Sequence, residues 1–166
     1  AHASNVAVTD YIKTAAAGLL MKKELAYFTM AMDKPVRPFV AIVGGKKVSD
    51  KVGVLSSLCN RVDKLIIGGG MAMTFFKAMG LEIGKSFAEE TALEAAREVI
   101  QIAKEKDIKL YMPVDFVVAD KFSAEAETKV VTSQEIPKDW MALDIGPATV
   151  TLFTEAIANA KTIIWN

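Results

Sequence analysis

Residues 39–51 read Phe39-Val40-Ala41-Ile42-Val43-Gly44-Gly45-Lys46-Lys47-Val48-Ser49-Asp50-Lys51, and residues 64–73 read Lys64-Leu65-Ile66-Ile67-Gly68-Gly69-Gly70-Met71-Ala72-Met73. In each stretch, a short apolar run typical of a strand ends in glycines and precedes a pattern typical of a helix. Half of the chain's 10 glycines lie in these two loops. Glycine lets the backbone turn sharply and lets a ligand approach the main chain. Because nucleotides bind at the carboxyl ends of parallel strands, the two loops predict a nucleotide-binding crevice.

Strand-like and helix-like segments alternate on both sides of these loops. This alternation predicts an α/β fold, in which a Rossmann-like parallel sheet carries helices on both faces in three αβα layers. Residues 121–139 are expected to be a polar, irregular surface excursion. Apolar spacing over residues 10–32 predicts one long helix, which either enters from a preceding domain or packs on the sheet. Strands are expected near 39–43, 64–67, 108–112, 116–118, 142–147 and 162–165, and helices near 49–60, 71–79, 88–106 and 149–160.

Composition narrows the class of protein. The chain has 166 residues, a length that suits one domain, and it is 52% hydrophobic. Its 20 basic and 20 acidic residues balance, which argues against a general nucleic-acid or anionic-membrane surface. Cys59 is the one cysteine, so no internal disulfide can form, and we expect it to be a buried apolar residue rather than a nucleophile. His2 receives no role, no secretory signal is visible, and both termini are expected to be cuts.

Three lysines crowd the expected start of the helix near 49–60. Lys46, Lys47 and Lys51 surround Ser49, the expected cap of that helix. Cations at a helix amino end are unfavourable by a few tenths to about 1 kcal/mol each, and a bound phosphate would reverse that sign. Lys47 and Lys51 are four residues apart and would share one face of the helix if the helix begins early enough to include both. The spacing is compatible with a polyphosphate site and equally with a solvated, charged turn.

The second loop offers bare backbone to a flat ligand. A nucleobase could lie against Gly69 and Gly70 with Met73 as a soft apolar wall, although a place in the core of a helix is favoured for Met73 and Phe76. The chain lacks the G-x-x-x-x-G-K-[ST] pattern of a P-loop. A dinucleotide fingerprint that starts at Gly68 would need glycine where Met73 stands. One cysteine and one histidine leave no zinc-binding spacing.

Taken together, these residues resemble the phosphoglycerate kinase family. The likeness covers essentially the whole chain, and its motifs follow the order that they have in the family. They are Ala1-His2-Ala3-Ser4, Ala15-Ala16-Ala17-Gly18-x-Leu20-Met21-x-Lys23-Glu24-Leu25, Gly44-Gly45-x-Lys47-Val48-Ser49-Asp50-Lys51, Asp63-Lys64-Leu65-Ile66-Ile67-Gly68-Gly69-Gly70-Met71-Ala72, Glu82-Ile83-Gly84-Lys85-Ser86, Pro113-Val114-Asp115, Trp140-Met141-x-Leu143-Asp144-Ile145-Gly146-Pro147 and Ala160-Lys161-Thr162-Ile163-Ile164-Trp165-Asn166.

The resemblance implies a domain organisation and an activity. Residues 1–13 would end a preceding substrate domain, residues 14–32 would form an interdomain connector helix, and residues 39–166 would form an incomplete nucleotide-binding domain. The family transfers a phosphoryl group reversibly between ATP and 3-phosphoglycerate, giving ADP and 1,3-bisphosphoglycerate, in glycolysis and gluconeogenesis. This implies a cytoplasmic, monomeric phosphotransferase with neither nucleic acid nor membrane as a partner. Because 3-phosphoglycerate would bind the missing domain, the chain alone is expected to be inactive.

The resemblance also implies roles for single residues. Lys47 would be the catalytic lysine that steadies the phosphoryl group, Lys51 would hold nucleotide phosphate, and Asn166 would face the phosphates. No metal ligand is assigned, because the residue that serves Mg²⁺ is expected outside this chain. The adenine–ribose pocket would be lined by Gly45, Gly69, Gly70, Met73, Ala142 and Leu143.

Two residues depart from the family pattern. Lys46 stands where the family has a small residue, and its charge is expected either to reach the purine pocket or to point to solvent. Ala142 stands where the family has glycine and adds a methyl group beside the base. Either departure could weaken nucleotide binding.

Two other functions are compatible with the loops. One is a nucleotide-binding module without catalysis, and the other is a nicotinamide-dependent oxidoreductase on a similar fold, which the failed fingerprint disfavours. Phosphoryl transfer to an ionised carboxylate needs no general base, so a site with lysines and no catalytic histidine suits it.

Overall fold

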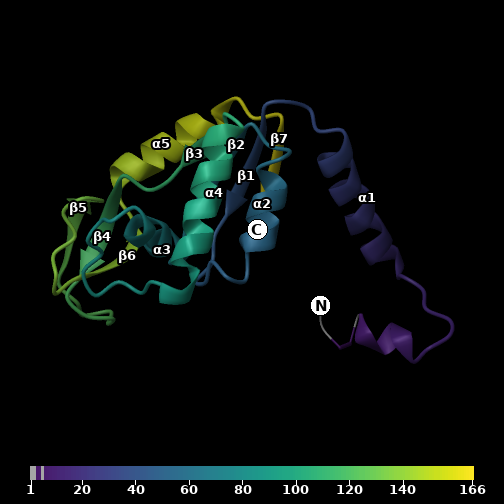
Figure 1. Ribbon diagram of the computed structural model, residues 1–166, viewed down its shortest axis with the longest axis horizontal. Helices are drawn as coiled ribbons and strands as arrows, with labels where there is room; N and C mark the ends of the chain where they lie inside the picture. The colour runs from purple at the N-terminus through teal and green to yellow at the C-terminus, as the bar shows by residue number, and fades with distance from the viewer. Residues whose placement is uncertain (1–2, 5) are drawn as a thin grey trace. The chain divides into compact units, whose positions relative to one another are not determined.

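The computed structural model of the chain describes residues 3–4 and 6–166 (Figure 1). The chain divides into two units between Lys34 and Pro35. His2, for which no role was expected, lies outside the described residues.

The first unit contains a short 3₁₀-helix, η1 (Ala7–Asp10), and one α-helix, α1 (Leu19–Asp33). The predicted helix over residues 10–32 is therefore wrong over its first part, because residues 11–18 are not helical. Gly18 takes an extended conformation, with φ −66° and ψ 165°, immediately before α1. A helix that continued through glycine would lose about 1 kcal/mol relative to alanine. None of the residues of α1 is buried, so packing does not offset that cost.

The second unit is built on a four-stranded parallel sheet in the order β3-β2-β1-β7. The register places Ile42 opposite both Ile66 and Trp165. The two central strands are almost entirely buried, as is typical of a sheet that is covered on both faces. The predicted parallel sheet is confirmed. Its strands are β1 (Phe39–Val43), β2 (Lys64–Ile67), β3 (Lys109–Tyr111) and β7 (Thr162–Trp165).

Helices cover both faces of this sheet, also as predicted. Helices α2 (Val52–Leu58) and α4 (Leu93–Glu105) lie in the crossovers that lead from β1 to β2 and from β2 to β3. Helix α5 (Pro147–Ala158) leads into β7, on the other side of β1. Because such crossovers are right-handed, α5 must cover the face opposite α2 and α4, and Figure 1 shows this arrangement. Beneath α5, the core is formed by Val40, Ile66 and Ala156.

A second, antiparallel sheet was not expected. It has the order β5-β4-β6 and consists of β4 (Asp115–Ala119), β5 (Thr128–Thr132) and β6 (Met141–Ile145). Two expectations are thereby corrected, since residues 121–139 contain a strand and residues 142–147 begin in a strand outside the parallel sheet. Strand β5 is mostly exposed and owes its conformation to pairing with β4, a contact that its own sequence does not reveal. The short helices α3 (Met71–Ala78) and η2 (Glu90–Ala92) lie between β2 and α4 along the chain.

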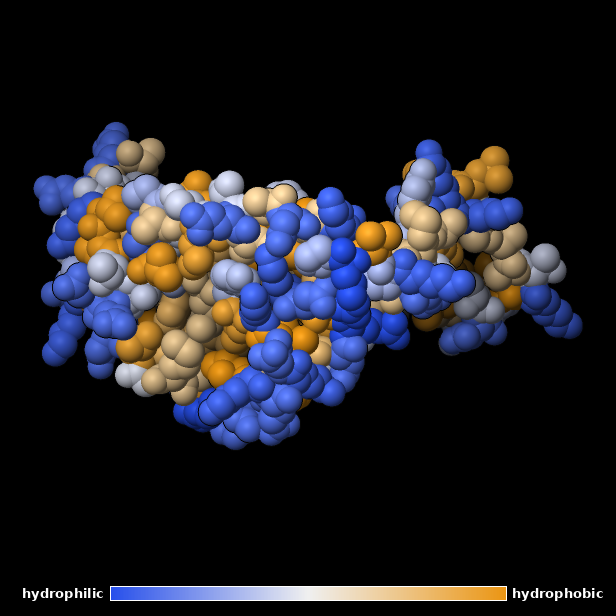
Figure 2. Space-filling view, turned by 90° about the horizontal axis from the view of Figure 1, so that it is seen from above, coloured by the Kyte–Doolittle hydropathy of each residue, from blue (hydrophilic) through white to orange (hydrophobic). Residues whose placement is uncertain are grey.

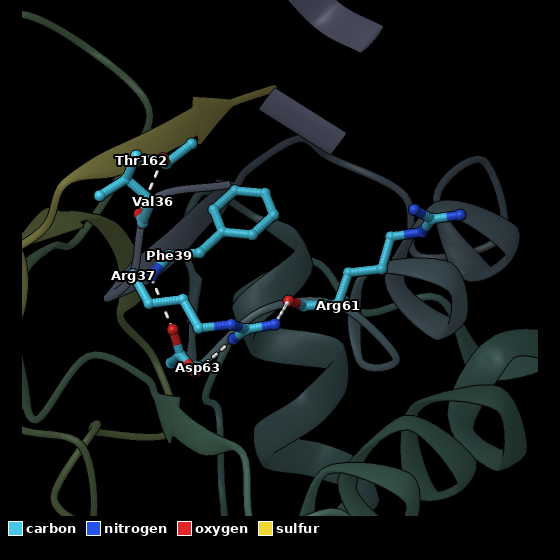
Figure 3. A network of polar contacts seen from close by, with 6 residues as sticks. All are labelled: Val36, Arg37, Phe39, Arg61, Asp63 and Thr162. Atoms are coloured by element: carbon cyan, nitrogen blue, oxygen red, sulfur yellow. Dashed lines mark hydrogen bonds and ion pairs between the residues drawn. The ribbon is translucent and has the colours of Figure 1, made fainter. Parts of the chain in front are cut away.

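A polar network fixes the amino ends of three strands of the parallel sheet (Figure 3). Asp63, just before β2, accepts a hydrogen bond of 2.7 Å from the backbone amide of Phe39 and forms an ion pair with Arg37. The hydroxyl of Thr162 donates to the carbonyl of Val36 at 2.9 Å. Because β1, β2 and β7 are aligned at their first residues, their carboxyl ends also come together, at the opposite edge of the sheet.

Charged side chains hold α5 at both of its ends. At the amino end, the Asp115 carboxylate accepts hydrogen bonds from the amides of Ala148 (3.0 Å) and Thr149 (2.7 Å) and from the Thr149 hydroxyl (2.6 Å). At the other end, the ammonium of Lys64 donates to the carbonyl of Ala156 at 2.7 Å and to Asn159 at 2.9 Å. Both charges complement the dipole of the helix. They tie α5 to β4 and to β2.

We expect Asp115→Asn to lower the free energy of unfolding at pH 7 by about 1–3 kcal/mol, because the amide loses charge-assisted hydrogen bonds. Burial raises the pKa of Asp115, but hydrogen bonds from Thr149 and Ala148 outweigh it and hold the pKa below its ordinary value. Stabilisation by such a carboxylate is present above the unfolded pKa of about 3.9 and is lost as the pH falls through the folded pKa. The difference between the two proteins in denaturant titrations should therefore shrink as the pH falls below about 4. Asp139→Asn, at an exposed ion pair, is the control, and a difference that does not shrink at all below that pH would contradict this account.

Figure 2 shows apolar side chains among charged ones on the surface of both units. Leu19 in α1 is 86% exposed, and Trp165 in β7 is 82% exposed. Within residues 3–4 and 6–166, no helix combines the length and the apolar character that crossing a bilayer requires.

Candidate functional site

The carboxyl ends of β1 and β7 meet at the first glycine loop. The amide of Asn166 donates to the carbonyl of Ile42, and the amide of Gly44 donates to the carbonyl of Asn166, both at 2.9 Å. In the order β3-β2-β1-β7, the crossovers diverge to opposite faces on either side of β1. Ligands of open α/β sheets bind at such a switch point. The loop after β1 and the residue after β7 therefore border the place where a ligand is expected.

The two glycine loops lie directly against each other. The amide of Gly68 donates to the carbonyl of Val43 at 2.9 Å, and that of Met71 donates to the carbonyl of Gly45 at 2.8 Å. Gly69 has φ +66°, and a Cβ atom there would lie 2.9 Å from both the nitrogen and the oxygen of Gly45. Only glycine fits at this contact, which brings the ends of β1 and β2 into one surface.

The three lysines of the first loop point in different directions. The ammonium of Lys51 donates a hydrogen bond to the side-chain oxygen of Asn166, so two of the predicted phosphate-facing residues meet. Lys47 is exposed, and its charge acts on the carboxylate of Glu89. Lys46 is exposed and lies over the ring of Phe87, with its nitrogen 4.8 Å from the centroid. The charge of Lys46 is therefore directed to the Phe87 ring.

Ser49 does not cap α2, contrary to prediction. Its amide donates to one oxygen of Glu89 at 3.0 Å, and its hydroxyl donates to the other at 2.5 Å. Helix α2 begins only at Val52, with no side-chain cap, and has seven residues. The Ser49 hydroxyl is directed to the Glu89 carboxylate, 40 residues later in the chain, and therefore does not bond to the backbone of the helix as a cap would. The lysines are therefore carried by a turn before the helix and not by its first turn.

A cavity of about 100 Å³ separates the second glycine loop and α3 from β6. It is the place where most of the predicted adenine–ribose residues converge. Met73 is 3% exposed, so it is a core residue of α3, and its side of the helix also lines the cavity. Phe76 packs edge-to-face on Phe116, with ring centroids 5.7 Å apart, and is a core residue. Of the predicted residues, the lining includes Gly69, Gly70, Met73, Ala142 and Leu143.

Sequence reasoning missed four residues that line the cavity, namely Pro113, Phe116, Asp144 and Ile145. One signal was available, because residues 113–115 directly follow a predicted strand and so fall at the same sheet edge as the glycine loops. The β6 wall is held from outside the cavity. There the amide of Ala142 donates to the hydroxyl of Ser86 at 2.9 Å.

A larger hollow of about 860 Å³ lies at the amino ends of β1 and β2, and none of the predicted site residues lines it. Its cysteine, Cys59, is 1% exposed, which confirms the expectation of a buried residue. Burial raises the pKa of the Cys59 thiol, against the opposing effect of Lys106. The hollow receives the carboxyl-terminal ends of α2, α4 and α5, where basic side chains complement the helix dipoles. The basic side chains that line this hollow therefore have a structural explanation.

The sequence pattern of the family described as "PGK: Phosphoglycerate kinase" matches residues 1–166. The chain belongs to the phosphoglycerate kinase family. It is 63% identical over 166 residues to the phosphoglycerate kinase of Geobacter metallireducens and 53% identical to the cytosolic phosphoglycerate kinase of Triticum aestivum. The structure of phosphoglycerate kinase from Coxiella burnetii is similar over 99% of the chain, with a TM-score of 0.88 and 41% identity. That likeness supports the α/β fold described above.

These relatives are longer than the chain. The chain spans 42% of the Geobacter protein, 41% of the wheat protein and 43% of the Coxiella chain. The phosphoglycerate kinase structure from Pyrococcus horikoshii matches 90% of this chain, with a TM-score of 0.73 and 26% identity, and 38% of its own length is covered.

Proposed function

We propose that this chain supplies the ADP/ATP side of a phosphoglycerate kinase. The whole enzyme would transfer the γ-phosphoryl group of ATP reversibly to 3-phosphoglycerate, giving ADP and 1,3-bisphosphoglycerate. The observation that carries the proposal is one continuous surface, on which the contact between Lys51 and Asn166 lies beside two touching glycine loops. The second of these loops lines the cavity in front of β6. The polyphosphate would occupy the lysine end of this surface, and the adenine would occupy the cavity.

The chemistry asked of these residues is positioning and charge stabilisation. A carboxylate oxygen of 3-phosphoglycerate attacks the γ-phosphorus of ATP while the bond to the bridging oxygen of ADP breaks. Both the attacking and the leaving oxygen are anionic at pH 7, so no proton transfer is needed. Negative charge spreads over the phosphoryl oxygens in the transition state, and fixed positive charge lowers its energy. We assign this role to Lys47 and the binding of the nucleotide phosphates to Lys51.

The residues near Lys51 and Asn166 do not by themselves fit a Mg²⁺ site. They offer an ammonium and an amide, whereas Mg²⁺ is usually bound through carboxylates and phosphate oxygens. Among the residues that the structure describes, no group of three or more His, Cys, Asp or Glu side chains could hold a metal ion. Any Mg²⁺ ligand is proposed to lie outside this chain.

The remaining assignments rest on family membership. We propose that residues 1–13 belong to the end of a preceding domain, that residues 14–32 connect the two domains, with α1 as their helical part, and that residues 39–166 are part of the nucleotide domain. The 3-phosphoglycerate site would lie in the other domain. We propose a cytoplasmic, monomeric enzyme that needs neither nucleic acid nor a membrane, and the name of the wheat relative supports the location.

A coupled assay for ADP release tests this function. A polypeptide of full family length that contains this chain should turn over ATP only when 3-phosphoglycerate is present. The 166-residue chain alone should bind ADP without turnover. Binding by the chain combined with no activity of the longer polypeptide would instead indicate a non-catalytic nucleotide-binding module.

A further inference from the structure

The loop that carries the lysines is held by one carboxylate from a distant part of the chain. Glu89 accepts hydrogen bonds from the amide of Ser49 at 3.0 Å and from its hydroxyl at 2.5 Å. These two bonds engage both oxygens of the carboxylate. Hydrogen bonds from Ser49 first of all, together with the charge of Lys47, hold the pKa of Glu89 below its usual range, so the group is a carboxylate at pH 7.

Glu89 is itself attached to the element that follows the second glycine loop. Its backbone amide donates to the hydroxyl of Thr74 at 3.0 Å. Thr74 is fully buried in α3, the helix that begins directly after Gly70. A single residue therefore links the first glycine loop to the helix of the second. The ammonium of Lys46 lies over the ring of Phe87, two positions before Glu89. This is a second contact between the first glycine loop and residues 87–89.

We propose that Glu89 is a positioning residue for the phosphate-binding lysines. Ser49, which Glu89 holds through its amide and its hydroxyl, lies between Lys47 and Lys51, so the carboxylate fixes the turn from which both ammonium groups project. Without it, that turn would sample other conformations, and part of the binding energy for phosphate would be spent on ordering it. The inference rests on the proposed function, because it assumes that these lysines meet nucleotide phosphate.

Titration of the 166-residue chain with ADP and with adenosine tests this role. We expect Glu89→Ala to weaken ADP binding by about 5- to 20-fold, near the lower end of the range for one charge-assisted hydrogen bond, and to change adenosine binding by less than about twofold. Glu89→Gln, which can still accept from Ser49, should recover most of the ADP affinity. Ser49→Ala should weaken ADP binding in the same direction. Glu90→Ala, which removes the neighbouring carboxylate paired with Lys77, is the matched control and should leave ADP binding unchanged.

A double-mutant cycle with Lys51→Met distinguishes positioning from a general structural effect. Nucleotide phosphate is assigned to Lys51 and the transition state to Lys47, so if Glu89 affects ADP affinity through Lys51, Glu89→Ala should cost little ADP affinity in the Lys51→Met background. Additive losses, or equal losses of ADP and adenosine affinity on Glu89→Ala, would overturn the inference and leave the proposed function intact. A wild-type chain that binds no ADP, or a Lys51→Met variant that binds it normally, would overturn the proposed function and this inference with it.

Discussion

Replacing Lys47 with methionine in a polypeptide of full family length should lower kcat by about 10²- to 10³-fold, with a much smaller change in the KM for ATP. Methionine keeps most of the length of the side chain and removes its charge. Loss of one preorganised donor that acts on charge developing in the transition state typically has an effect of about this size. A fall in kcat and in kcat/KM by similar factors would mean that the interaction is made in the transition state. Steady-state rates in both directions give the measurement.

Lys46→Met is the matched control, because it removes the same charge from the adjacent position. Its ammonium lies over Phe87, and neither residue lines the cavity, so we expect rates within about threefold of the wild type. If Lys47→Met were as active as Lys46→Met, Lys47 would have no part in catalysis.

The second large effect is expected at the contact between the glycine loops. Gly69→Ala should lower the free energy of unfolding by about 2–4 kcal/mol, because alanine at φ +66° is strained and its Cβ would overlap the backbone of Gly45. The obstacle is the main chain of Gly45, so no rotamer change relieves it. Separation of the loops should also weaken ADP binding by more than tenfold. Denaturant unfolding and calorimetric titration measure the two effects.

Gly68→Ala provides the comparison, since a Cβ atom there meets no atom of the described residues within 4 Å and Gly68 has no positive φ. It should change the free energy of unfolding by less than about 1 kcal/mol. Equal destabilisation by the two alanine substitutions would show that the close approach of Gly69 to Gly45 does not matter.

Three strands of the parallel sheet could be read from the sequence almost residue by residue. The predicted ranges 39–43, 64–67 and 162–165 coincide with β1, β2 and β7. In β1 and β2 this is because a strand covered on both faces is a continuous apolar run bounded by turn residues. Helix α4 has a different pattern, in which apolar residues recur at helical spacing along one buried face.

Elements that depend on distant partners could not be read in the same way. Strand β5 is exposed, and its one recorded partner is β4, so its residues carry no burial pattern. Ser49 has the sequence context of a helix cap, but an acidic residue 40 positions later takes its hydroxyl. The start of α1 depends on whether packing offsets the cost of placing Gly18 within a helix, and the spacing of apolar residues does not report that cost.

The candidate site, too, could be predicted from local sequence only in part. Glycines after parallel strands predict where a ligand binds from physical reasoning alone. The pairing of Ala142 and Leu143 with the triglycine around one cavity came only from the family resemblance, because more than 70 residues separate these segments. The contact between Lys51 and Asn166 joins residues that are 115 positions apart. No local sequence pattern predicts that these two residues are in contact.

Comparison of ADP and adenosine binding to the 166-residue chain, with and without Lys51→Met, tests the central claim most directly. If the lysine end of the surface grips nucleotide phosphate, ADP should bind about 10- to 100-fold more tightly than adenosine, and Lys51→Met should remove most of that difference. Adenosine affinity should not change in the variant. Equal affinity of the wild-type chain for ADP and adenosine, or an ADP advantage that survives Lys51→Met in full, would contradict the account.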